Sequence, residues 1–172
     1  MRRADDLDYL RGFASRTGPN VFVETGTFHG KTSRWAAERF QVVHTVELSY
    51  ELYRAAADAL TPLGVRCHHG DTLEHLPRLA KEIDEPVFWF LDAHWLDQPH
   101  AAGKGTQLPL HEELKALAER KYADVICVDD VASFGREEYQ PGWGEVALAW
   151  IAAHFPDRKV AMRYKDVAVV YR

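Results

Sequence analysis

The sequence predicts a single α/β domain over residues 1–172, in which helices cover both faces of a doubly wound, mostly parallel sheet of seven strands. Short β-branched runs alternate with longer helical patterns, an order typical of parallel strands joined by crossover helices. The run at 87–91 is wholly apolar, as expected of a central strand buried on both faces. Only a short turn separates the last two runs, so this closing pair is expected to be antiparallel.

Each expected element follows from a local pattern. The expected strands, rich in β-branched and aromatic residues, cover 20–24, 42–46, 64–68, 87–91, 124–128, 160–164 and 167–171. The expected helices, with apolar residues at helical spacing, cover 4–15, 32–40, 50–60, 72–83, 108–120 and 145–154. The run 64–68 is short and polar, which favours an edge of the sheet. Segments 94–107 and 132–143 lack a period and follow strand ends, where open α/β sheets bind ligands.

Composition argues against nucleic acid and membranes as partners and against secretion. There are 26 acidic and 21 basic residues, and the net charge of −5 does not provide the basic surface that nucleic acid requires. The longest apolar stretch, 86–91, is far shorter than the roughly 20 residues of a membrane helix. Acidic residues follow the basic start, unlike in a secretory signal. Cys67 and Cys127 fall in expected strands, which favours reduced core cysteines in a cytoplasmic protein.

The first expected strand leads into a turn that contains two glycines. Glycine lets the backbone turn tightly and approach a ligand without a Cβ in the way, and the following helix offers free N–H groups. The Gly-x-x-x-Gly spacing differs from the Gly-x-Gly-x-x-Gly of dinucleotide sites. The candidate cofactor-binding residues are Glu24, Gly26, Thr27, Gly30 and Thr32. The alternative is an ordinary turn with a helix cap.

Acidic residues also follow the next two expected strands. Glu47 ends the second strand, where a carboxylate can accept hydrogen bonds from both hydroxyls of a ribose. The alternative for Glu47 is a surface acid that caps the following helix. Asp71 and Thr72 follow the third strand, and both are candidate cofactor-binding residues. Asp71 can accept a hydrogen bond from the exocyclic amine of a purine, and it can also cap the next helix.

Three aspartates end two neighbouring central strands. Asp92 follows the strand at 87–91, and Asp129 and Asp130 follow the strand at 124–128. Because unpaired burial of like charges is costly, a bound cation is the simplest explanation for this cluster. All-oxygen ligation favours Mg²⁺, whereas an additional ligand such as His94 would favour Mn²⁺, Fe²⁺ or Zn²⁺. The alternative is an ion pair between the Asp129–Asp130 pair and a lysine or arginine.

Other ionisable residues are assigned structural roles. His68 and His69 end the expected edge strand and are expected to face solvent, and His75 is given no role. Glu112 and Glu113 open a helix and are expected to complement its N-terminus, with a ligand role as the alternative.

Together these residues resemble the class I S-adenosylmethionine-dependent methyltransferases, whose Rossmann-like sheet ends in an antiparallel strand pair. The turn at 24–30 looks like the family's first motif, which holds the methionine end of the cofactor. Glu47 matches the ribose-binding acid, and Asp71 matches the residue near the adenine. The resemblance extends over about residues 20–172, and it departs from the family where the common Gly-x-Gly core of the first motif is missing.

The aspartates further resemble the metal-dependent O-methyltransferases, closest to small bacterial proteins of this kind. There such acids ligate Mg²⁺, which holds two substrate oxygens, and this implies Asp92, Asp129 and Asp130 as metal ligands. The catechol-type catalytic lysine is absent, because Trp95 stands in its place. His94 is then the expected base, with Asp92 second, since the pKa of histidine near 6.5 suits proton removal at neutral pH. The alternative for His94 is a hydrogen-bonded packing residue.

The resemblance implies O-methylation of a small hydroxylated molecule, with S-adenosylmethionine and a divalent metal as cofactors. The short chain leaves an open site, or one whose walls come from a second subunit, so a homodimer is one expected assembly. A metal-dependent hydrolase or lyase on the same scaffold is the main alternative. A non-catalytic binding module is another. A nicotinamide-dependent reductase and a serine hydrolase are disfavoured, because their sequence fingerprints are missing.

Overall fold

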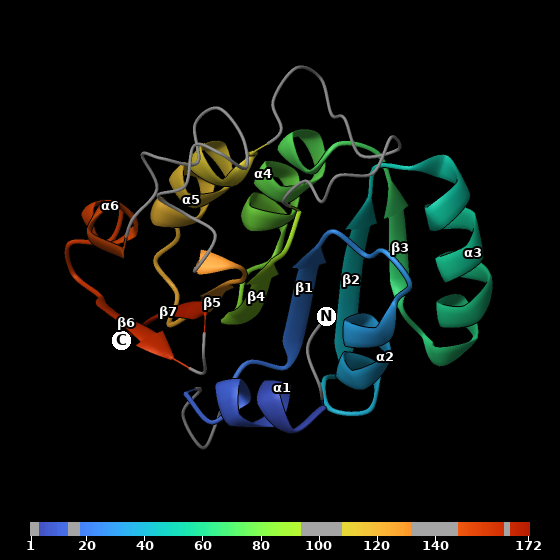
Figure 1. Cartoon of the computed structure of the whole chain (residues 1–172), viewed down its shortest axis with the longest axis horizontal. Coiled ribbons are helices and arrows are strands. Elements are labelled where there is room, and N and C mark those ends of the chain that lie inside the picture. The colour runs from blue at the N-terminus through green and yellow to red at the C-terminus, as the bar shows by residue number, and fades with distance from the viewer. Residues whose placement is uncertain (1–3, 14–17, 94–107, 132–147, 164–165) are drawn as a thin grey trace.

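The structure, a computed structural model, describes residues 4–13, 18–93, 108–131, 148–163 and 166–172. Seven strands form one sheet in the order β3-β2-β1-β4-β5-β7-β6 (Figure 1). The strands are β1 (Val21–Thr25), β2 (Val42–Glu47), β3 (Arg66–His69), β4 (Val87–Leu91), β5 (Val125–Val128), β6 (Lys159–Arg163) and β7 (Val167–Tyr171). The first five are parallel, and β7 runs antiparallel to both β5 and β6. The predicted doubly wound sheet with an antiparallel closing pair is therefore confirmed.

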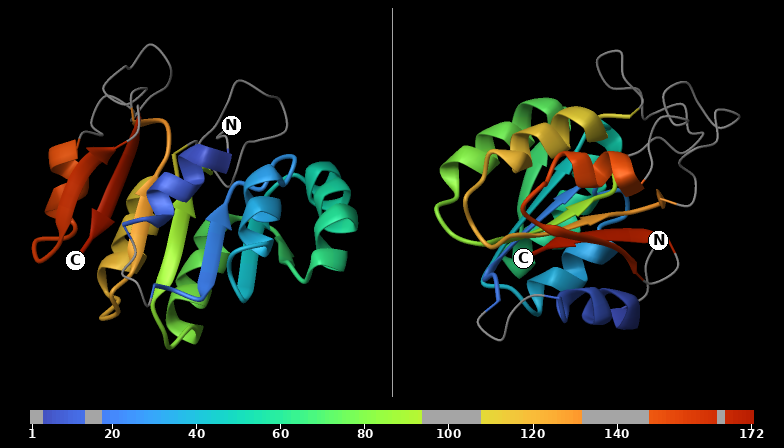
Figure 2. Two further views of the ribbon diagram at one scale, coloured as in Figure 1. Left: turned by 90° about the horizontal axis from the view of Figure 1, so that it is seen from below. Right: turned by 90° about the vertical axis from the view of Figure 1, so that its left-hand side faces the viewer.

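Helices cover the two faces of the sheet (Figure 2). They are α1 (Ala4–Arg11), α2 (Lys31–Ala37), α3 (Tyr50–Leu60), α4 (Thr72–Glu82), α5 (Leu110–Ala118) and α6 (Leu148–Ala153), with a 3₁₀ turn η1 (Thr61–Leu63) after α3. Successive residues of β1 point to opposite faces, so Val21 and Val23 pack with α4, α5 and α6, whereas Phe22 packs with α1, α2 and α3. None of the helices in the described ranges is long and apolar enough to cross a lipid bilayer.

The sequence predicts every strand to within about two residues, and it places β3 at an edge and β4 at the centre correctly. Helix ends are predicted less well. The first helix ends at Arg11 and not at residue 15, because Gly12 closes it through backbone hydrogen bonds to Asp8 and Tyr9. The helix expected from residue 108 starts at Leu110, with Pro109 in the capping position outside it.

A buried ion pair fixes the end of the sheet opposite the site. Arg120 Nε lies 2.8 Å from Asp124 Oδ2, and both side chains are almost completely shielded from solvent. The guanidinium also donates hydrogen bonds to the carbonyl oxygens of Ala80, Ile83 and Glu85, and Asp124 accepts the backbone N–H of Val87. The pair therefore joins the end of α4 and the start of β4 to the connection between α5 and β5.

Removing the cation of this pair should destabilise the whole domain. Arg120→Met leaves Asp124 buried without its main partner, so the free energy of unfolding should fall by about 3–5 kcal/mol in urea denaturation. Arg78→Met is the control, because the Arg78–Glu82 pair is exposed and should cost under about 1 kcal/mol. Equal losses for the two variants would contradict this account.

Candidate functional site

The candidate site lies at the edge of the sheet where the parallel strands end. The chain leaves β1 toward β2 and β3 on one side, while β4 and β5 lie on the other side, so a topological switch point falls between β1 and β4. Open α/β sheets bind ligands in the crevice at such a point. Acidic residues follow the strands on both sides of it: Glu47 ends β2, Asp71 follows β3, and Asp92 follows β4.

Gly26 allows the turn after β1 to pass directly against the end of β4. Its φ is 83°, and a Cβ at this position would lie 2.4 Å from the carbonyl oxygen of Asp92. The N–H groups of Gly26 and Thr27 both donate to the carbonyl oxygen of Val46 at the end of β2. Gly30 also has a positive φ, and a Cβ there would lie 2.8 Å from the side chain of Leu60. The turn therefore depends on glycine at both predicted positions.

Glu24 supports this turn from below. Its side chain is 1% exposed, and Oε2 accepts hydrogen bonds from Ser33 Oγ at 2.5 Å and Thr45 Oγ1 at 2.9 Å. The hydroxyl of Thr27 lies 2.6 Å from that of Thr45, and Thr32 is also buried beside the network. Burial raises the pKa of Glu24 to about 7, although the neighbouring hydroxyls favour the ionised form. The side chains of Glu24 and Thr27 are thus engaged beneath the turn.

Glu47 joins the two loops that face each other across the end of β2. Its Oε2 accepts the backbone N–H of Phe28 at 2.8 Å, and its Oε1 accepts that of Ser49 at 2.9 Å. The side chain is buried and not a surface acid, although Ser49 is indeed the capping residue of α3. Each carboxylate oxygen has two acceptor positions, so one on each remains for a ligand.

Phe28 holds an unusual backbone conformation in the same turn. Its φ is 48°, in the left-handed region that an aromatic residue adopts at a cost of about 1 kcal/mol or more. The ring is 45% exposed and lies 3.9 Å from the His29 ring, measured between centroids. The hydrogen bond from the Phe28 N–H to Glu47 keeps the turn in this shape. The backbone of Phe28 thus adopts a conformation that glycine adopts at a lower cost.

The turn between β3 and α4 presents Asp71. Asp71 is the predicted cap of α4, because its Oδ1 accepts the N–H of Leu73 at 2.9 Å. The Thr72 hydroxyl donates to Oε1 of Glu113 at 2.8 Å. Burial raises the pKa of Glu113 to about 7, and the nearby Asp71 carboxylate adds to that effect.

Glu113 lies in the first turn of α5, as the sequence predicts, but its side chain is buried at 1% exposure and faces the protein interior, which the sequence did not predict. The spacing of Glu113 from the leucines of the same helix could have predicted its burial. Glu113 falls on the same helix face as Leu110, Leu114 and Leu117, where an apolar residue is expected.

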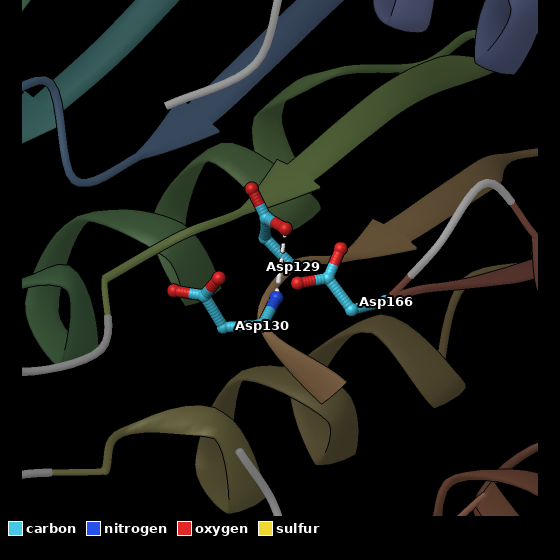
Figure 3. Close-up of side chains that lie close together, drawn as sticks. All are labelled: Asp129, Asp130 and Asp166. Atoms are coloured by element: carbon cyan, nitrogen blue, oxygen red, sulfur yellow. Dashed lines mark hydrogen bonds between the residues drawn. The ribbon is translucent and has the colours of Figure 1, made fainter. Parts of the chain in front are cut away.

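Asp92 and the Asp129–Asp130 pair interact electrostatically across β4 and β5. Burial, then the carboxylates of Asp129 and Asp130, raise the pKa of Asp92 well above its usual value. The N–H of Asp130 donates to Asp129 Oδ1 at 2.7 Å, and the backbone of Asp130 is left-handed with a φ of 55°. Carboxylate oxygens of Asp129, Asp130 and Asp166 lie within 4.8 Å of one another (Figure 3).

Asp166 was missed as a candidate ligand. It follows β6 and precedes β7, and the antiparallel return brings it beside the end of β5. The three clustered carboxylates provide the oxygen donors that a hard cation such as Mg²⁺ prefers, so the residues present fit a divalent metal. Asp92 is not part of this group, although its carboxyl group interacts electrostatically with Asp129 and Asp130. The expected base, His94, lies outside the described residues.

His68 is only partly exposed to solvent, because its ring pairs with that of His44 on the neighbouring strand. His44 Nδ1 and His68 Nε2 are 2.9 Å apart, and the two rings are parallel within 2°. Burial is the main cause that lowers the pKa of both rings to about 4, which favours two neutral imidazoles at neutral pH. His69 is exposed, as expected. His75 Nε2 contacts the carbonyl oxygen of His69 at 3.0 Å.

An open groove of about 670 Å³ lies between α4 and α5, away from these acidic residues. Its lining includes Leu73, Pro77, Lys81, Lys115 and Tyr122, and none of the predicted site residues contributes to it. The chemistry-bearing residues gather at the sheet edge and not in this groove.

Comparison with known proteins shows the fold. No family model and no curated protein matches the chain. Among solved structures, it is similar to an O-methyltransferase from Bacillus cereus in complex with S-adenosylhomocysteine, with a TM-score of 0.62 and 17% identity over 100% of this chain and 83% of that one. The methyltransferase PaMTH1 from Podospora anserina, bound to S-adenosylhomocysteine, has a TM-score of 0.63 and 17% identity over 90% and 72%.

A 23S rRNA methyltransferase, ErmE, has a TM-score of 0.61 and 12% identity, covering 100% of this chain and 69% of that one. Such identities establish the class I methyltransferase fold, and they leave the acceptor open.

Gly26→Ala tests the close approach at the switch point. Gly64→Ala is a matched control, because Gly64 has the same φ of 83° but a Cβ there would meet nothing within 4 Å. The control should lose only the backbone cost of about 1–2 kcal/mol. Gly26→Ala should lose at least about 2 kcal/mol more in thermal or urea unfolding, because the Asp92 backbone must move. Similar losses would show that the contact with Asp92 does not constrain the turn.

Glu24→Gln tests the buried carboxyl group. The pKa of Glu24 in the folded chain, about 7, exceeds its usual 4.5, so the folded state holds the proton more tightly and stability falls as the pH rises through this window. Between pH 4.5 and 8, the wild type should lose about 3 kcal/mol of unfolding free energy relative to Glu24→Gln. A difference between the two proteins that stays constant with pH would contradict the raised pKa.

Proposed function

We propose that the chain is an S-adenosylmethionine-dependent methyltransferase that methylates a hydroxyl oxygen of a small molecule with the help of a divalent cation. The observation that carries the proposal is the row of carboxylates around the switch point, with Glu47, Asp71 and Asp92 at the ends of neighbouring strands. S-adenosylmethionine offers a cationic sulfonium, two ribose hydroxyls and an adenine amine, which carboxylates can bind. A pyrophosphate-containing dinucleotide would be repelled by the same groups.

Different residues would bind different parts of the cofactor. The backbone of the turn with Gly26 and Gly30 would hold the methionine end, with Glu24, Thr27 and Thr32 supporting that turn from below. This distinguishes two residues that contact the cofactor from three that position the turn. Glu47 would accept from the ribose hydroxyls at its remaining lone pairs.

Asp71 would accept from the adenine amine, and Thr72 would hold Asp71 in place. Asp71 Oδ1 also accepts the helix-capping hydrogen bond from the N–H of Leu73.

The acceptor would bind on the side of Asp92, Asp129 and Asp130, with Asp166 as an additional metal ligand. Bound S-adenosylmethionine supplies the methyl group, and a bound divalent cation such as Mg²⁺, or Mn²⁺, Fe²⁺ or Zn²⁺, lowers the pKa of the acceptor hydroxyl. The chain positions the two reactants and takes up the proton. His94 is the proposed base and Asp92 the second choice, since the raised pKa of Asp92 suits a carboxylate that takes up a proton.

Asp92 cannot act as ligand and base at once. A cation beside Asp92 would favour its ionised form, whereas burial and the carboxylates of Asp129 and Asp130 raise its pKa. Two arrangements are therefore possible. If the metal is held by Asp92, Asp129 and Asp130, the base is His94. If it is held by Asp129, Asp130 and Asp166, Asp92 is available as the base.

The small net negative charge favours a small-molecule acceptor over nucleic acid. Cys67 and Cys127 form no disulfide, which supports the proposed cytoplasmic location. A homodimer that completes the open site stays a prediction.

Calorimetry with S-adenosylhomocysteine tests the proposed function. Wild-type protein should bind the ligand, and Glu47→Gln should weaken binding by about 10–100-fold, because hydrogen bonds to a charged acceptor are lost. Glu51→Gln, an exposed acid in the first turn of α3, is the control and should leave the dissociation constant unchanged. Absence of binding to the wild type would overturn the proposal.

The same titration with Mg²⁺ separates the rival functions. Asp129→Asn with Asp130→Asn should abolish Mg²⁺ binding while it leaves S-adenosylhomocysteine binding largely unchanged. Metal binding without cofactor binding would instead indicate a metal-dependent hydrolase or lyase. Cofactor binding without metal binding in the wild type would indicate a binding module or a metal-independent enzyme.

A further inference from the structure

Glu113 is a buried acid that packing does not require. It lies in α5 on the helix face that packs against the sheet, and its carboxyl group is 1% exposed. An apolar side chain of similar size at this position would avoid the cost of burying a carboxyl group, which amounts to several kcal/mol for an ionised one. The position of Glu113 therefore calls for an explanation other than core packing.

The hydrogen bonds of Glu113 point to such an explanation. Oε1 accepts the hydroxyl of Thr72 at 2.8 Å, across 41 residues of sequence. Oε2 has no hydrogen-bond partner in the described structure, and neither does the buried hydroxyl of Thr25 at the end of β1. The Thr25 hydroxyl still lies close enough to favour the ionised form of Glu113. Glu113 thus stands between the end of β1 and the first residue of α4.

Thr72 is the immediate neighbour of Asp71 in a turn that is held from two sides. On one side, His75 Nε2 contacts the carbonyl oxygen of His69, and its ring packs against Gly70, where a Cβ would lie 2.8 Å away. On the other side, Glu113 holds Thr72. Gly70 itself has a φ of 139°, a conformation that side chains rarely adopt. Little freedom remains for Asp71 between these two attachments.

We propose that Glu113 is a positioning residue for the adenine end of the cofactor site, which acts by holding Thr72 so that the Asp71 carboxylate keeps its direction toward the adenine amine. The inference rests on the proposed function and deepens it, because it makes the discrimination of adenine depend on a helix that does not itself touch the ligand. Loss of the Thr72–Glu113 hydrogen bond should leave the fold in place but reduce the preference of the site for a ligand that carries the amine.

The test compares two ligands that differ at that amine and at the neighbouring ring nitrogen N1, which accepts in adenine and carries a hydrogen in hypoxanthine. S-adenosylhomocysteine carries the exocyclic amine, and S-inosylhomocysteine carries a carbonyl oxygen in its place, which a carboxylate repels. The wild type should bind S-adenosylhomocysteine at least about 10-fold more tightly. The analogue lacks the amine, so the carboxylate that accepts it would be left without a donor. The measured quantity is the ratio of the two dissociation constants from calorimetry.

Three variants separate the roles. Thr72→Val removes the donor at nearly constant volume, and Glu113→Ala removes the acceptor, so each should lower the ratio by at least about 5-fold. Glu113→Gln keeps a carbonyl oxygen for Thr72, and its amide can donate to the Thr25 hydroxyl, so the ratio should stay near that of the wild type. Glu112→Gln, the exposed neighbour on α5, is the control and should change nothing. Circular dichroism and the melting temperature show that each variant folds.

The outcomes are distinct. A ratio that is unchanged in Thr72→Val, or one that falls as far in Glu113→Gln as in Glu113→Ala, would overturn the positioning role. Equal weakening of both ligands would also overturn it and would leave Glu113 a purely structural residue. If Glu113→Ala does not fold, Thr72→Val and Glu113→Gln still decide the question. If the wild type binds neither ligand, the proposed function itself is contradicted. If it binds both ligands with equal affinity, only the proposed hydrogen bond between Asp71 and the adenine amine is contradicted.

Discussion

The close approach of Gly26 to the backbone of Asp92 is the constraint on which the site depends. It brings the turn after β1 against the end of β4 at the point where the strand order reverses. Any residue with a Cβ would push the two strand ends apart. Because the N–H of Gly26 also bonds to Val46 at the end of β2, a single glycine sets the relative positions of three strand ends. This contact therefore determines how the acidic residues at those strand ends lie relative to one another.

The acids of this edge belong to two layers. Glu47, Asp71 and Asp92 lie at the ends of strands, at the edge where the proposed cofactor would bind. Glu24 and Glu113 lie beneath, one on each face of the sheet, and both have a pKa raised to about 7 by burial. Glu24 accepts the hydroxyl of Ser33 in α2, and Glu113 accepts the hydroxyl of Thr72, the first residue of α4. The fold thus accepts two buried acids at a cost in stability, and in return the turns that face the ligand are fixed in place.

The sequence was sufficient for the fold and for the strand-end residues, because both follow from local rules. Strand periodicity and the short closing turn predict the strands and the antiparallel closing pair, and glycines and acids at strand ends give the candidate site residues, whose roles stay predictions. The sequence did not predict Asp166 or Glu113, because their roles arise from contacts between segments far apart in the chain. Nor did it predict that His68 pairs with His44 on the neighbouring strand. Side-chain direction at strand ends, as for Glu24, required coordinates.

The most direct test of the central claim is a crystal structure of the chain with S-adenosylhomocysteine. The account predicts the ligand across the switch point, with its homocysteine end over Gly26. The ribose hydroxyls should then lie within hydrogen-bond distance, about 3 Å, of the Glu47 carboxylate. A ligand bound elsewhere, for example in the groove between α4 and α5, or a ribose that does not contact Glu47, would contradict it.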